Sequence, residues 1–144
     1  MKRHEVIAPL SRDHHGSLLL AQLLKKNAPI YRDMPVATED KAKYAQAQFE
    51  GHIKKHFEQE ETMLELAKDC NTEVNILTGQ IKTEHRELTA LFQSLETATD
   101  LKCTMDTLAI ALEKHIRKEE RILFPLLQLH CSEELLKEIH NLLH

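Results

Sequence analysis

Two His-x-x-x-Glu pairs constrain the fold of this chain more than any other feature of its sequence. His56 and Glu60 form the first pair, and His115 and Glu119 form the second, each in a stretch rich in helix-forming residues. Residues four apart on a helix project from the same face, so each pair presents two metal-ligating side chains together. Helix bundles build two-metal carboxylate sites from such pairs. The duplication therefore predicts a helical bundle with a metal site in its core.

The composition of the 144 residues fits a single helical domain. The chain has 3 Gly, 4 Pro, 2 Tyr and no Trp, and it is rich in Leu, Lys, Glu and Ala, which lose little rotamer freedom in a helix. We expect residues 1–144 to form one all-α domain, an up-down antiparallel four-helix bundle with a short C-terminal fifth helix. The helices are predicted at residues 9–27, 38–70, 72–98, 100–130 and 132–144. In the fourth helix, Ile122 is expected to face the core, and Pro125 is expected to kink or end the regular part.

Charge and hydropathy argue against two classes of partner. The formal net charge is −4 and the pI is about 6.2, with Lys and Arg interleaved with acids, so no basic surface for nucleic acid is expected. No stretch approaches the roughly eighteen apolar residues of a membrane span, which predicts a cytoplasmic protein. Cys70, Cys103 and Cys131 lack Cys-x-x-Cys spacing and are interpreted as reduced thiols.

Histidines of neighbouring predicted helices lie at matching depths along the bundle. With a rise of about 1.5 Å per residue, His56 and His85 lie roughly 22 and 21 Å from the turn between the second and third helices. His85 and His115 lie roughly 21 and 24 Å from the next turn. The first helix brings His14 and His15 to a similar depth, although the long loop that follows loosens this estimate. Four imidazoles and two carboxylates can therefore meet in one layer.

The apolar neighbours of these residues favour a metal over a structural role. A single histidine beside an apolar face is more often a satisfied core residue than a ligand. A buried glutamate without a partner costs several kcal/mol, however, and Glu60 and Glu119 both fall at core positions. His52 could support the site or lie at the mouth of a pocket. Acids beside the motifs are interpreted as solvated charges on the helix faces: Glu58, Glu61, Glu84 and Glu120.

The motifs resemble those of the hemerythrin-like HHE cation-binding family. The resemblance extends from about Leu10 to Leu127. It is carried by Asp13-His14-His15, His56-Phe57-x-x-Glu60, His85, and His115-x-x-x-Glu119-Glu120-Arg121-x-Leu123-Phe124-Pro125. It implies an up-down four-helix bundle that holds two iron ions joined by an oxo or hydroxo bridge.

In such a centre Glu60 and Glu119 would be the bridging carboxylates. The resemblance assigns terminal positions to three histidines, His56, His85 and His115, and to one histidine of the first helix. Either His14 or His15 could fill that position, and the spacing of His15 from Leu18 and Leu19 favours His15. Zinc or manganese would also suit this set of ligands.

One departure from the family pattern bears on function. Oxygen-carrying hemerythrins place two histidines one turn apart on the third helix, whereas Ile81 and Thr89 stand four residues either side of His85. Fewer protein ligands favour labile iron or reaction with small ligands over simple oxygen carriage. We expect a di-iron protein that binds or senses O2 or NO, with peroxide as a further candidate. The alternatives are storage or donation of labile iron, and an interaction module whose C-terminal helix contacts a protein partner.

Overall fold

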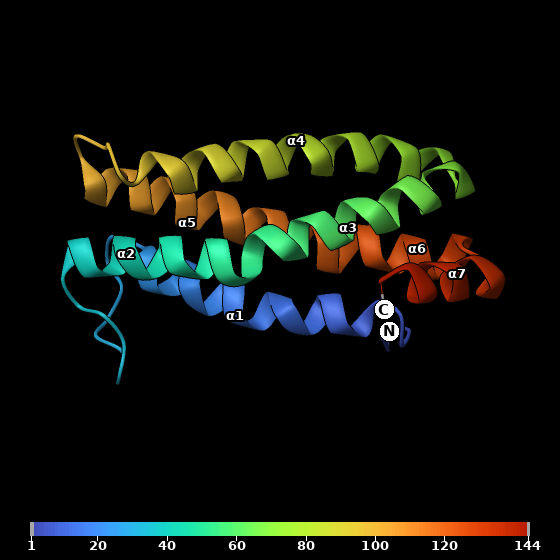
Figure 1. Ribbon diagram of the computed structural model, residues 1–144, viewed down its shortest axis with the longest axis horizontal. Helices are drawn as coiled ribbons and strands as arrows, with labels where there is room; N and C mark the ends of the chain where they lie inside the picture. The colour runs from blue at the N-terminus through green and yellow to red at the C-terminus, as the bar shows by residue number, and fades with distance from the viewer. Residues whose placement is uncertain (1, 144) are drawn as a thin grey trace.

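A computed structural model describes residues 2–143 as a bundle of long antiparallel helices, without a strand in that range (Figure 1). The elements in chain order are α1 (Ala8–Leu24), α2 (Thr38–Gln48), the π-helical turn η1 (Phe49–Ile53), α3 (Lys54–Ala67), the 3-10 turn η2 (Lys68–Cys70), α4 (Thr72–Ser94), α5 (Leu101–Lys118), the π-helical turn η3 (Glu119–Leu123), α6 (Phe124–His130) and α7 (Glu133–Leu143).

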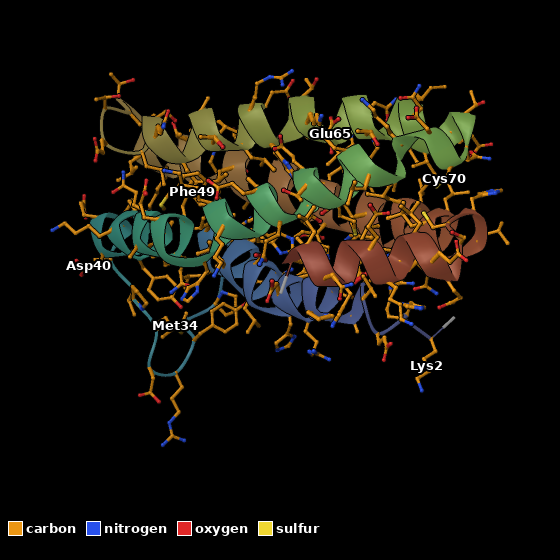
Figure 2. The ribbon with its side chains drawn as sticks, turned by 45° about the vertical axis from the view of Figure 1, so that its right-hand side comes forward. Lys2, Met34, Asp40, Phe49, Glu65 and Cys70 are labelled. Carbon is orange, nitrogen blue, oxygen red and sulfur yellow. The ribbon has the colours of Figure 1, made fainter. Side chains whose placement is uncertain are left out.

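These elements form four rods and a short fifth helix. The first rod is α1, the second runs without a break from α2 to η2, the third is α4, and the fourth runs from α5 to α6. The α1–α2 connection, which carries Met34, projects from one end of the bundle, and α7 lies at the other (Figures 1 and 2). The predicted all-α bundle with a short fifth helix is confirmed. None of the described helices has the length and apolar character needed to cross a bilayer.

Side-chain caps begin the helices that follow the short turns. Asn71 accepts a hydrogen bond of 2.8 Å from the backbone N–H of Glu73, at the start of α4. Asp100 accepts one of 3.1 Å from the N–H of Cys103, at the start of α5. Each satisfies a helix N–H that would otherwise have no partner. The caps fix where α4 and α5 begin, as the sequence predicted, although α1 and α4 end a few residues earlier than expected.

The fourth rod passes Pro125 without ending. The ring of Pro125 removes a donor and clashes with the carbonyl four residues earlier, and the π-helical turn Glu119–Leu123 lies immediately before α6. A π turn contains one extra residue, so it also rotates every side chain after it. Ile122, predicted to face the core, lies within this turn and is 48% exposed, while Phe124 and Leu127 after it are buried.

Two apolar cores fill the ends of the bundle. The loop-end core includes Leu20, Phe49, Phe92 and Leu112. The α7-end core includes Leu10, Leu64, Phe124, Leu136 and Ile139, so α7 closes the bundle with its own apolar face. The buried polar and charged side chains are His14, His56, Glu60, Thr78, His85, His115 and Glu119. Among these, the histidines and glutamates form a polar layer, whose geometry is described below.

Candidate metal centre

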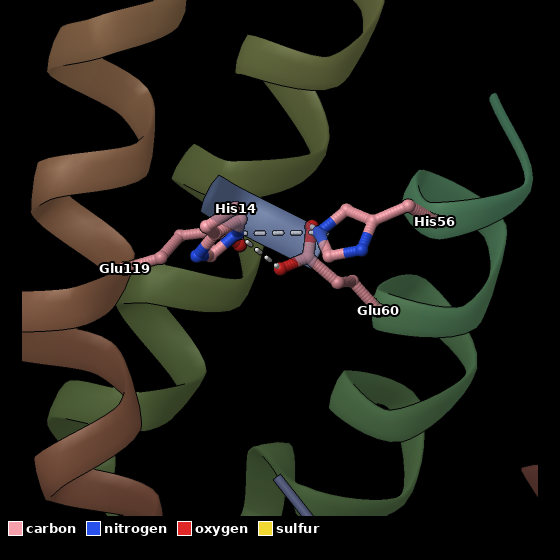
Figure 3. A group of neighbouring side chains, drawn as sticks. All are labelled: His14, His56, Glu60 and Glu119. Carbon is pink, nitrogen blue, oxygen red and sulfur yellow. Dashed lines mark hydrogen bonds and ion pairs between the residues drawn. The ribbon is translucent and has the colours of Figure 1, made fainter. Parts of the chain in front are cut away.

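Six buried side chains from all four rods meet in the polar layer. They form two overlapping groups, in each of which the candidate ligand atoms lie within 4.8 Å of one another. The first group, drawn in Figure 3, consists of His14, His56, Glu60 and Glu119. The second group consists of Glu60, His85, His115 and Glu119. Both groups contain the same two carboxylates, so the layer could hold two ions side by side.

In the first group two imidazoles face the same point from different rods. His14 Nε2 lies 3.1 Å from Glu119 Oε1 and 3.7 Å from Glu60 Oε2. His56 Nε2 lies 3.3 Å from Glu60 Oε1 and 3.2 Å from His14 Nε2. Figure 3 shows these side chains reaching toward one another from α1, α3 and the fourth rod. Two ring nitrogens converging with carboxylate oxygens create a position that a cation could occupy.

The second group repeats this arrangement on the other side of the carboxylates. His85 Nε2 lies 3.1 Å from Glu60 Oε1, and His115 Nε2 lies 3.1 Å from Glu119 Oε1. Each of these two oxygens therefore faces one histidine of each group. The ring of Phe57 stacks on His85 with 4.0 Å between the ring centroids. The two glutamates stand where bridging ligands would stand.

Several polar atoms in the layer have no hydrogen-bond partner among the described residues. They are His14 Nδ1, Glu60 Oε2, His115 Nε2 and both carboxylate oxygens of Glu119. A buried polar atom without a partner costs about 1–3 kcal/mol, and more when it is charged. A divalent cation would satisfy the inward-facing atoms of this set, and imidazole with carboxylate suits iron, zinc and manganese. The residues present therefore fit a pair of metal ions.

Without metal, protons on the histidines partly balance the negative charge of the buried carboxylates. Burial disfavours the charged form of both His14 and His115, but the Glu119 carboxylate, 3.1 Å from each, outweighs it, with support from Glu120 and Glu60 for His14. The pKa of His14 is raised to about 11 and that of His115 to about 10. Burial opposes the charge on Glu60, yet His56 and His14 hold its pKa well below its usual value. Burial and the neighbouring charge of Glu60 raise the pKa of Glu119.

Histidines of the second group turn their outer ring nitrogens toward acids. His85 Nδ1 donates a hydrogen bond of 2.8 Å to Glu61, and His115 Nδ1 donates one of 2.7 Å to Glu84. Glu84 also accepts a bond of 2.7 Å from Lys118, and these two bonds outweigh burial and lower its pKa. Such bonds fix the tautomer that leaves Nε2 free to face a metal. The interpretation of Glu61 and Glu84 as solvated charges is wrong.

The outer ring nitrogens of the first group also face acids, but at longer distances. His56 Nδ1 donates a hydrogen bond of 3.1 Å to Asp13. His14 Nδ1 lies 3.6 Å from Glu120 Oε1, which is an ion-pair distance but too long for a hydrogen bond. Glu120 is held in turn by Ser11 and Arg3. Glu120 is thus also a partner of the site, whereas Glu58 is exposed as expected.

The four outer acids are chain neighbours of ligands, which explains how sequence reasoning missed them. Asp13 precedes His14, Glu61 follows Glu60, Glu84 precedes His85 and Glu120 follows Glu119. One residue turns about 100° around a helix, so each acid points past the layer and reaches toward the adjacent rod. Each acid serves a histidine on that rod, and the contacts close a ring around the bundle. The signal that could have revealed these acids is their position directly next in sequence to a buried candidate ligand.

The preference for His15 over His14 is wrong. His14 is 3% exposed and lies in the first group, whereas His15 is exposed and lies in neither. His14 follows Leu10 by four residues on the buried stripe of α1, while Leu19, four residues after His15, is 54% exposed. Apolar residues lie on two adjacent faces of α1, so the sequence did not decide which face is buried. His52, the other uncertain histidine, is exposed on η1 outside both groups.

Comparison with known proteins places the chain in a family. A family model described as the hemerythrin HHE cation binding domain matches residues 5–127, and a second match covers residues 76–142. We found no significant similarity to a curated protein or to a solved structure. The first match contains all six side chains of the polar layer and most of the length of the four rods. The chain therefore belongs to the hemerythrin HHE cation-binding domain family.

Proposed function

We propose that this protein holds two iron ions in the polar layer and binds or senses a diatomic ligand, O2 or NO, at that centre. The observation that carries the proposal is the shared position of Glu60 and Glu119, each with an oxygen about 3 Å from a histidine of both groups. A pair of iron ions would supply electrons and an open coordination position. The family is described as cation-binding, which supports the metal.

The third rod provides a single candidate ligand, His85. Ile81 and Thr89, one turn either side of His85, provide no metal ligand to the layer. Ile81 is buried and apolar, and the hydroxyl of Thr89 donates a hydrogen bond of 2.7 Å to the backbone carbonyl of His85. Four imidazoles and two shared carboxylates cannot fill the octahedral shells of two ions. This favours ligand binding over a closed structural metal site.

The surroundings of the layer restrict the access of water and orient the candidate ligands. Phe57 covers His85, and Phe124 stacks on His14 with 5.5 Å between ring centroids. The two apolar cores close the bundle on both sides of the layer. In such a setting the carboxylates would attract a cation strongly, because little solvent screens their charge. The outer acids hold the protons of the Nδ1 atoms, so the Nε2 atoms remain available.

Labile iron storage or donation is a second candidate function. It is favoured by the raised pKa values of His14 and His115, because protons on these imidazoles compete with the metal near neutral pH. Iron held against such competition would exchange more readily than iron in a deprotonated site. The rate of iron transfer to a chelator, compared with the rate of reaction with O2 or NO, separates the two functions.

The test is anaerobic loading with Fe(II), followed by metal analysis and absorption spectra before and after exposure to air or NO. We expect two iron ions per chain and charge-transfer bands that change with the added gas. The double variant His56→Ala, Glu119→Ala should lose both. The variant His15→Ala is the matched control, because His15 is the exposed neighbour of His14. Less than one iron per chain, without bands linked to oxidation, would overturn the proposal.

A further inference from the structure

A groove of about 520 Å³ lies between α1 and the second rod and reaches the first group of the metal centre. Asp13 and His56, which are joined by a hydrogen bond of 3.1 Å, form part of its wall. His56 is 7% exposed, the largest exposure of the six side chains in the layer. The groove is therefore the side from which the first group can be approached.

Two glycines keep this groove open. Gly16 on α1 and Gly51 on η1 both line it, and a Cβ added at either position would meet no atom within 4 Å. A glycine inside a helix costs about 1 kcal/mol relative to alanine, and close packing explains neither one. Gly51 also lies within a π-helical turn, a feature that often occurs at functional sites.

The groove carries an excess of basic side chains. Arg12, His52 and Lys55 line it, and none of the three makes an ion pair with an acid within residues 2–143. The one acid in the lining is Asp13, whose carboxylate accepts the bond from His56. A concave surface with charge of one sign focuses its field and concentrates ions of the opposite sign. This groove would attract anions.

The hollows over the other histidines lack this excess. The hollow of about 340 Å³ beside His85 contains three acids and two basic residues, namely Glu50, Glu58, Glu61, Lys54 and Arg86. The hollow of about 360 Å³ beside His115 contains two of each, namely Glu84, Glu87, Lys114 and Lys118. Phe57 also covers the face of His85. Among these three hollows, the excess of basic side chains is thus specific to the groove beside His56.

We propose that the groove between α1 and η1 binds small inorganic anions and admits them to the metal centre past His56. The binding step depends only on the groove, whereas the access step rests on the proposed iron centre. Arg12 and Lys55 would attract the anion, and the bare backbone at Gly16 and Gly51 would leave it a path. Small neutral ligands would share the path without the attraction.

The binding step can be tested without iron. The chain has 3 glycines, of which Gly16 and Gly51 lie in the groove and Gly79 lies on α4, so their amide resonances are natural reporters. We expect thiocyanate, titrated into the zinc-loaded protein, to shift the Gly16 and Gly51 resonances along a saturable curve and to leave Gly79 unchanged. The double variant Arg12→Gln, Lys55→Gln should weaken binding about tenfold. Equal shifts at all three glycines, or none at Gly16 and Gly51, would overturn the proposal.

The access step is tested by stopped-flow kinetics on the iron-loaded protein. Gly51→Leu places a side chain in open space at a helical position, so folding should be preserved, and Gly79→Leu is the matched control. We expect Gly51→Leu to slow both thiocyanate binding to the oxidised centre and NO binding to the reduced centre, by about tenfold. Arg12→Gln with Lys55→Gln should slow thiocyanate alone. Unchanged rates in Gly51→Leu would overturn the access step. Failure to load iron would count against the proposed function and leave the glycine titration standing.

Discussion

The two groups of the metal centre share Glu60 and Glu119 but differ in how firmly their histidines are held. In the second group, the outer nitrogens of His85 and His115 lie 2.8 and 2.7 Å from their acids. In the first group the corresponding distances, from the histidines to Asp13 and Glu120, are 3.1 and 3.6 Å. The same types of ligand therefore form one tightly supported half and one looser half.

Solvent accounts for the longer contact of Asp13, whereas Glu120 is only 24% exposed and is drawn from His14 by its contacts with Ser11 and Arg3. The side chain of Asp13 is 54% exposed, so water competes for its oxygens, whereas Glu84 is 25% exposed and is also held by Lys118. The looser half is also the half that opens on the groove. A centre can thus combine a rigid anchor with an adaptable position for ligands, using one set of side chains. The two halves should therefore respond differently to pH and to the loss of individual side chains.

The largest expected effect is that of pH on metal affinity. His14 in the first group and His115 in the second have pKa values raised to about 11 and about 10, so both bind a proton at pH 7 without metal. A raised pKa stabilises the metal-free fold fully below 6.5, and this contribution is lost as the pH rises through 10 to 11. Metal must displace these protons, so affinity should rise with pH, by about tenfold per pH unit for each proton.

Zinc competition with a chelator at pH 7, 8 and 9 measures this dependence. With both protons displaced, affinity should increase about a hundredfold per unit. His14→Gln and His115→Gln should each reduce the slope to about tenfold per unit. If the pH dependence of zinc affinity weakened in only one of these variants, the histidines of the two groups would differ in the protons that they release. An affinity that is flat above pH 7 would contradict the ionisation states derived from the geometry.

Removing a shared carboxylate should affect both halves at once. Glu119→Gln is expected to abolish the stabilisation that metal gives, about 4 kcal/mol when free metal exceeds its dissociation constant a thousandfold. Thermal unfolding with and without metal measures this loss. Glu134→Gln, an exposed change on α7, is the control and should keep the full shift. If Glu119→Gln retained half of the stabilisation, the two groups would be independent rather than bridged.

Removing an outer acid should lower metal affinity more in the second group than in the first. Loss of such a partner commonly lowers metal affinity 10–100-fold, and we expect Glu84→Gln to fall in this range. Asp13→Asn should lose less than about tenfold, because its longer bond is shared with water. Metal titrations of both variants against one chelator give the comparison. Equal losses would mean that the distances in the two groups carry no energetic difference.

The smallest expected effect comes from the aromatic covers. Phe57→Leu removes a ring stacked on His85 at 4.0 Å and should lower the free energy of unfolding by about 1 kcal/mol beyond the lost apolar area. Phe124→Leu, whose ring lies 5.5 Å from His14, should lose less of this stacking contribution. Denaturant unfolding of the metal-free variants measures both. A larger stacking loss at Phe124 would reverse the assignment of the rigid half.

The helical periodicity predicted the rods and most of the buried side chains of the polar layer. Glu60 and Glu119 lie on apolar stripes four residues after a histidine, and the helices capped by Asn71 and Asp100 begin within one residue of the expected positions. The π-helical turns could not be predicted, because stripe analysis assumes a constant 3.6 residues per turn. Ile122, which lies within such a turn, was consequently assigned to the wrong face.

Other features were missed because the default assumption about a residue type was wrong. Acids on helix faces are usually solvated, so Glu61, Glu84 and Glu120 were assigned to the surface until the rods were packed. In α1 the choice between His14 and His15 depended on which apolar stripe faced inward. Only the contacts with the other rods decide that question. Sequence therefore predicted the inner layer better than the side chains that support it.

The ring of outer acids has a consequence for moving this centre into another protein. Four dipeptides, Asp13-His14, Glu60-Glu61, Glu84-His85 and Glu119-Glu120, each combine an inward ligand with an acid that supports a histidine on the adjacent rod. Grafting the six inward residues alone would leave every imidazole without its support. The smallest transferable unit is a dipeptide, and a recipient bundle must have the same handed order of rods for each acid to find its histidine.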